Sequence, residues 1–111
     1  MPDGKKVYSN CKNVNLREID LKFANLQGAD LRGTNLKGAS LKGANLNQAN
    51  MRGVNLTEAD LRDADLSEAD LSGAYLSQAN LTEANIKNIR NLDSAIKCKT
   101  IFSWGEEHSG C

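Results

Sequence analysis

The chain repeats itself every five residues over most of its length, and this period limits its possible folds more than any other feature. Sixteen pentapeptides follow one another without interruption over residues 9–88. Each contains one large apolar residue, and a small residue, most often Ala, stands two positions before it. The large apolar positions are Leu16, Leu21, Leu26, Leu31, Leu36, Leu41, Leu46, Met51, Leu56, Leu61, Leu66, Leu71, Leu76, Leu81 and Ile86, with Cys11 in register ahead of them.

A period of five fits neither an α-helix nor a straight strand. In an α-helix, five residues turn through about 500°, so successive leucines would lie on every side of the helix. In a straight strand, they would alternate between the two faces of the sheet. Both conflicts disappear if the chain turns a corner once per repeat, because the small residue and the Leu then point inward together. We therefore expect these two columns to form the core and the other three to face solvent.

The repeats resemble a known family. Residues 24–33 read ANLQGADLRG, which is similar to the pentapeptide repeat family, whose consensus is a small residue, Asp or Asn, Leu or Phe, and two variable residues. The resemblance covers about 80 of the 111 residues. It implies an all-β fold, a right-handed quadrilateral β-helix with four repeats per coil, so that the sixteen repeats would make about four coils.

This resemblance divides the chain into an N-terminal lead-in at residues 1–8, a solenoid at 9–88 and a C-terminal cap at 89–111. A stack of coils needs a cover at each end, because each coil buries its apolar residues only against its neighbours. At the N-terminal end, larger residues stand in the small column, and we expect them to plug the stack. They are Ser9, Val14 and Ile19, with Val7 and Tyr8 just upstream.

At the C-terminal end the repeat phase fails after Ile86, and two structures are open for the cap. Ile89, Leu92 and Ile96 could form one face of a short amphipathic helix, or the segment could be an irregular extra coil. Phe102 and Trp104 are two of only five aromatic residues in the chain. They are expected either to cover the last leucines or to form an exposed contact patch.

The three cysteines do not form a metal-binding pattern. The chain has no CxxC pair and His108 is its only histidine, so a closed zinc site is not expected. Cys11 occupies a core position, where a thiol behaves as a small apolar group. Cys98 and Cys111 bound a tail that resembles the cysteine-bounded tail of some bacterial pentapeptide repeat proteins. That resemblance implies a disulfide between them under oxidising conditions.

We predict no catalytic, cofactor-binding or metal-binding residues, and hence no enzyme. His108 is expected to be solvated, and no histidine stands in a repeat to activate a serine nucleophile. The carboxylates of Asp60, Asp65 and Asp70 would point from different faces of the coil, so they should not converge on one ion.

Charge is separated along the sequence although the net charge is zero. Residues 1–56 carry nine Lys and Arg against four acids, and residues 57–85 carry one Arg against seven acids. With four repeats per coil, residues 20 apart lie in one column. The basic columns would then be Lys12, Arg32 and Arg52; Arg17 and Lys37; and Lys22, Lys42 and Arg62.

These features favour a non-catalytic structural or protein-interaction module whose partner is not identified, present as a monomer or an end-to-end dimer. The alternative, implied by other family members, is a DNA-mimicking protein that binds a type II topoisomerase such as gyrase. We expect no cofactor, no direct binding to nucleic acid and no membrane association. The N-terminal sequence lacks the apolar stretch of a signal peptide, which predicts a cytoplasmic location, or an exported one if the chain is a mature form.

Overall fold

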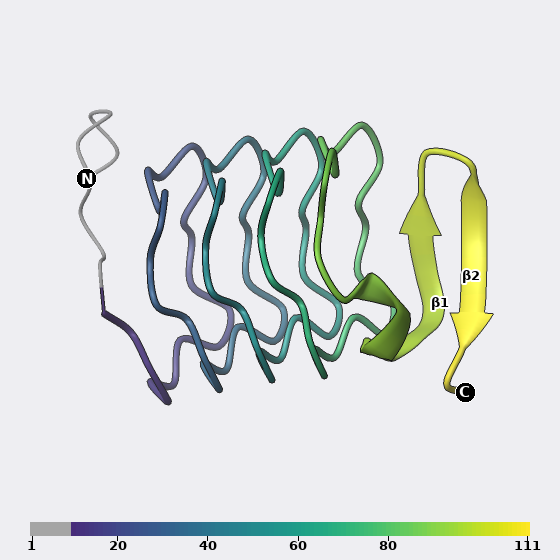
Figure 1. Ribbon diagram of the computed structural model, residues 1–111, viewed down its shortest axis with the longest axis horizontal. Coiled ribbons are helices and arrows are strands. Elements are labelled where there is room, and N and C mark those ends of the chain that lie inside the picture. Colours follow the sequence, from purple (N-terminus) through teal and green to yellow (C-terminus); the bar gives the residue numbers. More distant parts are fainter. Residues whose placement is uncertain (1–9) are drawn as a thin grey trace.

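The computed structural model describes residues 10–111, except the side chain of Ser109, and the expectations for Val7, Tyr8 and Ser9 lie outside this range. Parallel single-residue bridges join positions 20 residues apart, from Asn10 with Asp30 through to Asp70 with Arg90. Twenty residues are four pentapeptides, so the fourth repeat brings the chain back beside its starting point. Figure 1 shows the resulting turns side by side, from purple at the N-terminal end to green.

Each repeat forms the corner that its period requires. In one example, the backbone N–H of Thr34 donates to the carbonyl oxygen of Leu31 at 3.1 Å and closes a turn. The third residue of this turn, Gly33, has a φ of 65°, in the left-handed region. Asp30 precedes the turn, and its Oδ1 accepts a hydrogen bond from the N–H of Arg32 at 3.2 Å. The Asn and Asp column is therefore explained by a local side-chain contact that stabilises each corner.

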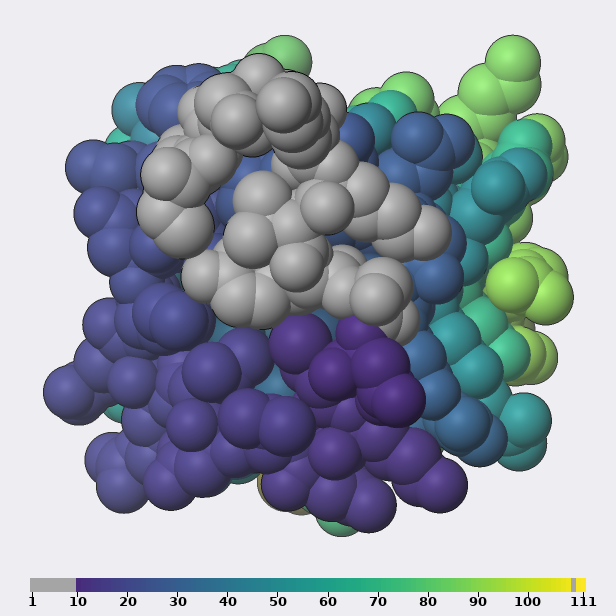
Figure 2. Space-filling model, turned by 90° about the vertical axis from the view of Figure 1, so that its left-hand side faces the viewer, coloured from purple at the N-terminus to yellow at the C-terminus, as the bar shows by residue number. Residues whose placement is uncertain are grey.

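The core consists of the two columns that were expected to point inward. The large apolar residues from Leu21 to Leu81 are buried, as are most of the small residues beside them. Leu16 and Ile86, at the two ends of the column, are only half-buried. Of the residues expected to plug the first coil, Ile19 is partly buried against the core, whereas Val14 has 41% of its surface exposed. Figure 2 views the stack from its N-terminal end, where the early turns lie in front of the later ones.

The C-terminal segment is an irregular coil followed by a hairpin. It contains the 3₁₀ turn η1 (Leu92–Ser94), strand β1 (Lys97–Phe102) and strand β2 (Gly105–Ser109). The bridges of this segment are displaced by one residue. Ile96, just before β1, pairs with Tyr75, and Ile101 in β1 pairs with Asn80, each 21 positions earlier. The η1 turn accommodates this extra residue. No α-helix is present within residues 10–111, in agreement with an all-β fold, and the bridged coil extends past residue 88.

Strand β1 adds one more layer to the core. With the offset of 21, Lys97 and Phe102 occupy the positions of Leu76 and Leu81, and both are buried. Strand β2 pairs antiparallel with β1 and forms the outermost edge in Figure 1. Its charged residues discourage another chain from pairing with this edge. None of the helical segments described here is long and apolar enough to cross a membrane.

Candidate functional site

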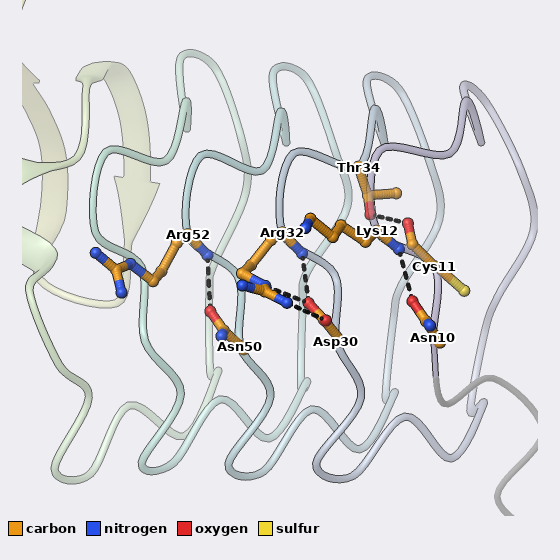
Figure 3. A network of polar contacts seen from close by, with 8 residues as sticks. All are labelled: Asn10, Cys11, Lys12, Asp30, Arg32, Thr34, Asn50 and Arg52. Atoms are coloured by element: carbon orange, nitrogen blue, oxygen red, sulfur yellow. Dashed lines mark hydrogen bonds and ion pairs between the residues drawn. The ribbon is translucent and has the colours of Figure 1, made fainter.

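Three basic side chains stand above one another on a single face. Lys12, Arg32 and Arg52 each follow the large apolar residue of their repeat and lie 20 residues apart. Adjacent strands are separated by about 4.8 Å, so the column spans about 10 Å along the stack. Figure 3 shows all three side chains projecting from neighbouring turns on the same side. We call this set the cationic column.

The charge of Arg32 is already engaged within the chain. Its Nε and Nη2 donate to the two carboxylate oxygens of Asp30 at 2.8 and 2.7 Å. These hydrogen bonds lower the pKa of Asp30 to about 2. Within residues 10–111, neither Lys12 nor Arg52 forms an ion pair. The column therefore has two cations without an ion pair and a bidentate pair between them. The charges of Lys12 and Arg52 also act at longer range, and they favour the ionised forms of Asp30 and Asp70.

Glycine follows two of the three cations of the column, as Gly33 and Gly53, and it stands at the same place in the next turn as Gly73. Gly33, Gly53 and Gly73 all have φ values near 65°, which is the left-handed conformation that glycine adopts most readily. A Cβ placed on Gly53 or Gly73 would meet no atom within 4 Å. A partner can therefore approach the backbone closely at Gly53 and Gly73, whereas the side chain of Asn13 lies over Gly33.

A second basic column lies on another face and is neutralised to a greater extent. Arg62 makes the same bidentate contact with Asp60, with a Nη2–Oδ2 distance of 2.7 Å. Lys22 lies 3.9 Å from Asp20, a contact in which both side chains are exposed. Only Lys42 forms no ion pair among the described residues of this column. The exposed Lys22–Asp20 pair contributes little to stability.

The C-terminal cap has a cavity of about 460 Å³ that is partly open to solvent, which we call the cap cavity. Phe102 is buried and stacks on the ring of Trp104, with 4.5 Å between the ring centroids and 4° between the planes. The indole N–H of Trp104 donates to Oε1 of Glu107 at 3.3 Å. Residues from η1, both strands and the connecting turn line the cavity: Leu92, Asp93, Lys97, Phe102, Trp104 and Glu107.

Lys97 is the unusual member of this set, since it stands where the repeats place a leucine. The residue is only 7% exposed. The ammonium group donates to the carbonyl oxygens of Leu92 and Ala95 at 2.8 and 3.2 Å. These two carbonyl oxygens, at the start of η1 and just after its end, compensate the ammonium group for its loss of water. A one-residue insertion brings Lys97 into this position, and in the sequence it is visible only as the loss of the five-residue repeat phase after Ile86. The sequence analysis did not predict the cap cavity.

The three cysteines and His108 do not form a common site. Cys98 and Cys111 form a disulfide that ties β1 to the end of the chain. Cys11 is buried, and burial, followed by the nearby charge of Asp30, raises the pKa of its thiol. His108 is exposed and its Nε2 lies 3.1 Å from a carboxylate oxygen of Glu106. Among the described residues, no group of three His, Cys, Asp or Glu side chains could hold a metal ion.

The two aromatic residues of the tail have different environments. Phe102 is 3% exposed and covers the core beside Leu81, whereas Trp104 is 61% exposed. The predicted alternatives for this pair, a core cover and an exposed contact patch, are thus divided between them.

Comparison with known proteins agrees with the repeat geometry. The family model for pentapeptide repeats matches residues 9–48, 34–73 and 59–90, in eight copies. The chain belongs to the pentapeptide repeat family. Family members of this type fold as right-handed quadrilateral β-helices. No curated protein sequence matches this pentapeptide repeat protein.

Several solved pentapeptide repeat structures are similar to this one. The protein alr5209 from Nostoc PCC 7120 is 41% identical, with a TM-score of 0.72, and the match covers 75% of this chain and 68% of that one. Rfr23 from Cyanothece 51142 is 33% identical over 78% of this chain, with a TM-score of 0.55. HetL from Nostoc PCC 7120, described as involved in heterocyst differentiation regulation, is 30% identical over 89% of this chain, with a TM-score of 0.51. The chain spans 62% of Rfr23 and 51% of HetL.

Proposed function

We propose that this pentapeptide repeat protein is a non-catalytic interaction module that binds an acidic surface of a protein partner through the cationic column. The proposed scaffold is a right-handed quadrilateral β-helix of about four coils. The observation that carries the proposal is that Lys12 and Arg52, which form no ion pair with the described residues, flank the Arg32–Asp30 pair on one face.

The rigidity of this face supports the proposal. The turns that hold the cations are fixed by hydrogen bonds between adjacent coils, such as that from the N–H of Gly33 to the carbonyl of Arg52 at 3.0 Å. A fixed backbone loses little conformational entropy when a partner binds, which is favourable for affinity. Opposite charge on the partner would increase the association rate, and added salt would reduce the effect.

Affinity capture from an extract of the source cell, followed by mass spectrometry, tests the proposal. The chain with Lys12→Glu and Arg52→Glu should lose a partner that the unmodified chain captures at low salt. A matched control carries Lys87→Glu and Lys99→Glu, which reverse two exposed charges outside the column. Equal capture by both variants would contradict the assignment of this face.

A further inference from the structure

The cap cavity presents one open face of an aromatic ring beside two carboxylates. One face of Trp104 is covered by Phe102, yet 61% of the residue is exposed, so its other face is accessible. The hydrogen bond from the indole to Glu107 holds the ring in a defined orientation and places a carboxylate at its edge. Asp93, from the η1 turn, is a second acidic residue in the lining of the same cavity.

The charges of the cavity favour a cation over an anion. Asp93 and Glu107 contribute two negative charges against the single positive charge of Lys97. The ammonium group of Lys97 is also directed to the carbonyl oxygens of Leu92 and Ala95, which offset part of its charge. The face of an indole ring is itself attractive to cations, because it is the negative region of the ring quadrupole.

The apolar part of the lining indicates what kind of cation fits. Leu92 and Phe102 contribute hydrocarbon surface to the cavity. Lysine and arginine side chains combine a charged head with an apolar stem that packs along such surfaces. A small hydrated metal ion would gain nothing from this part of the lining.

We propose that the cap cavity binds a lysine or arginine side chain of a protein partner, with the charged head over Trp104 and between Asp93 and Glu107. The assignment rests on the proposed function as an interaction module, but it concerns the opposite end of the solenoid from Lys12. The buried ammonium of Lys97 keeps the incoming cation at the rim of the cavity.

Trp104 is the only tryptophan in the chain, so its fluorescence reports directly on this site. We would titrate the oxidised protein with a short glycine–arginine peptide and with the same peptide carrying citrulline, which has nearly the same shape and no charge. The arginine peptide should produce a saturable change in emission that weakens with added salt, and the citrulline peptide should not. Equal responses to the two peptides would overturn the proposal.

A pair of neighbouring substitutions provides the matched control. Glu107→Gln removes a carboxylate that lines the cavity and should weaken binding of the arginine peptide by about fivefold or more. Glu106→Gln makes the same charge change one residue away on β2, where the carboxylate contacts His108 and does not line the cavity. Equal affinities for the two variants would overturn the assignment, provided that near-ultraviolet circular dichroism shows that both retain the folded cap.

The outcomes separate this inference from the proposed function. If the chain with Glu107→Gln still binds the arginine peptide as the unmodified chain does, the cavity is not the site, even if the cationic column captures a partner. If sedimentation shows a dimer that dissociates on Glu107→Gln, the cation comes from a second copy and the assignment to another protein is wrong. Loss of peptide binding on Glu107→Gln supports the cavity even where charge reversal of the column has no effect.

Discussion

The ring of Phe23 lies over Gly43 on the neighbouring turn. A Cβ added to Gly43 would come 2.5 Å from both Cδ1 and Cε1 of that ring. Phe23 is itself 64% exposed and has a φ of 61°, an uncommon conformation for a bulky residue. Glycine is therefore favoured at this position for two reasons: the left-handed backbone, which residues such as Gln48 and Glu58 also adopt in other repeats, and the aromatic ring above it.

Two glycine substitutions separate these reasons. Gly53 has the same φ as Gly43, 67°, but no atom lies within 4 Å of its added Cβ. Gly53→Ala should lower the free energy of unfolding by about 1–2 kcal/mol, the cost of the left-handed conformation. Gly43→Ala should cost about 0.5–1.5 kcal/mol more, because the exposed ring must leave its rotamer while the backbone stays in place.

Urea denaturation measures both values. The additional loss should vanish in the background of Phe23→Ala, where no ring lies over residue 43. Equal losses for Gly43→Ala and Gly53→Ala in the unmodified background would show that the ring imposes no constraint.

The position of a leucine along the stack should determine its contribution to stability. Leu46 lies between coils on both sides, whereas Leu21 belongs to the first turn and has a bridged neighbour on one side only among the described residues. Leu46→Ala should reduce the free energy of unfolding by about 2–5 kcal/mol. Leu21→Ala should cost less, since terminal turns of a repeat stack open more easily. Identical shifts of the thermal midpoint would contradict this order.

The disulfide should stabilise the cap. Cys98 and Cys111 are 13 residues apart, and a loop of this size contributes about 3 kcal/mol in the chain-entropy model. Cys111→Ser should therefore lower the midpoint temperature of cap unfolding more than that of the coils. The emission of Trp104 reports on the cap, and far-ultraviolet circular dichroism reports on the coils. Cys11→Ala is the control, since Cys11 forms no disulfide. Mapping that finds Cys11 in a disulfide in the oxidised protein would refute this pairing.

The Asp30–Arg32 pair should give a local dependence on pH. Hydrogen bonding to Arg32 lowers the pKa of Asp30 from 3.8 to about 2 in the folded chain. The pair therefore contributes its full stability above pH 3.8 and loses it as the pH falls towards 2. In a titration followed by NMR, Arg32→Gln should raise the pKa of Asp30 towards 3.8. The pKa of Asp60, which Arg62 lowers, should not change and serves as the internal control.

Gyrase provides a test of the alternative function. A DNA duplex carries one negative charge per ~1.7 Å of axis. This chain has a net charge of zero and a basic column at its N-terminal end, so it is a poor electrostatic mimic. We expect no inhibition of supercoiling and no protection from quinolones at micromolar protein and low salt. Dose-dependent inhibition that disappears on Asp60→Asn, Asp65→Asn and Asp70→Asn would favour DNA mimicry instead.

The repeating part of this fold was predictable residue by residue. A period of five requires a corner in each repeat. The Leu and Ala columns can then both point only to the inside of the coil. The Asn and Asp column reflects a contact within two residues, such as that between Asp30 and the N–H of Arg32. These features depend on neighbours in the sequence or on an adjoining turn of the same sequence pattern. They can therefore be predicted from the amino-acid sequence without knowledge of the tertiary structure.

The remaining features depend on contacts that the period does not specify. The bridge offset of 20 sets which side chains share a column, and that offset follows from how the turns close in space. The burial of Lys97 follows from the extra residue taken up at η1, which moves the chain by one position relative to the turn beneath it. Phe102 is buried and Trp104 exposed because the chain reverses between them and only one ring can lie on the core. Such outcomes are decided by how the last turn packs on the end of the stack, where no identical neighbour follows.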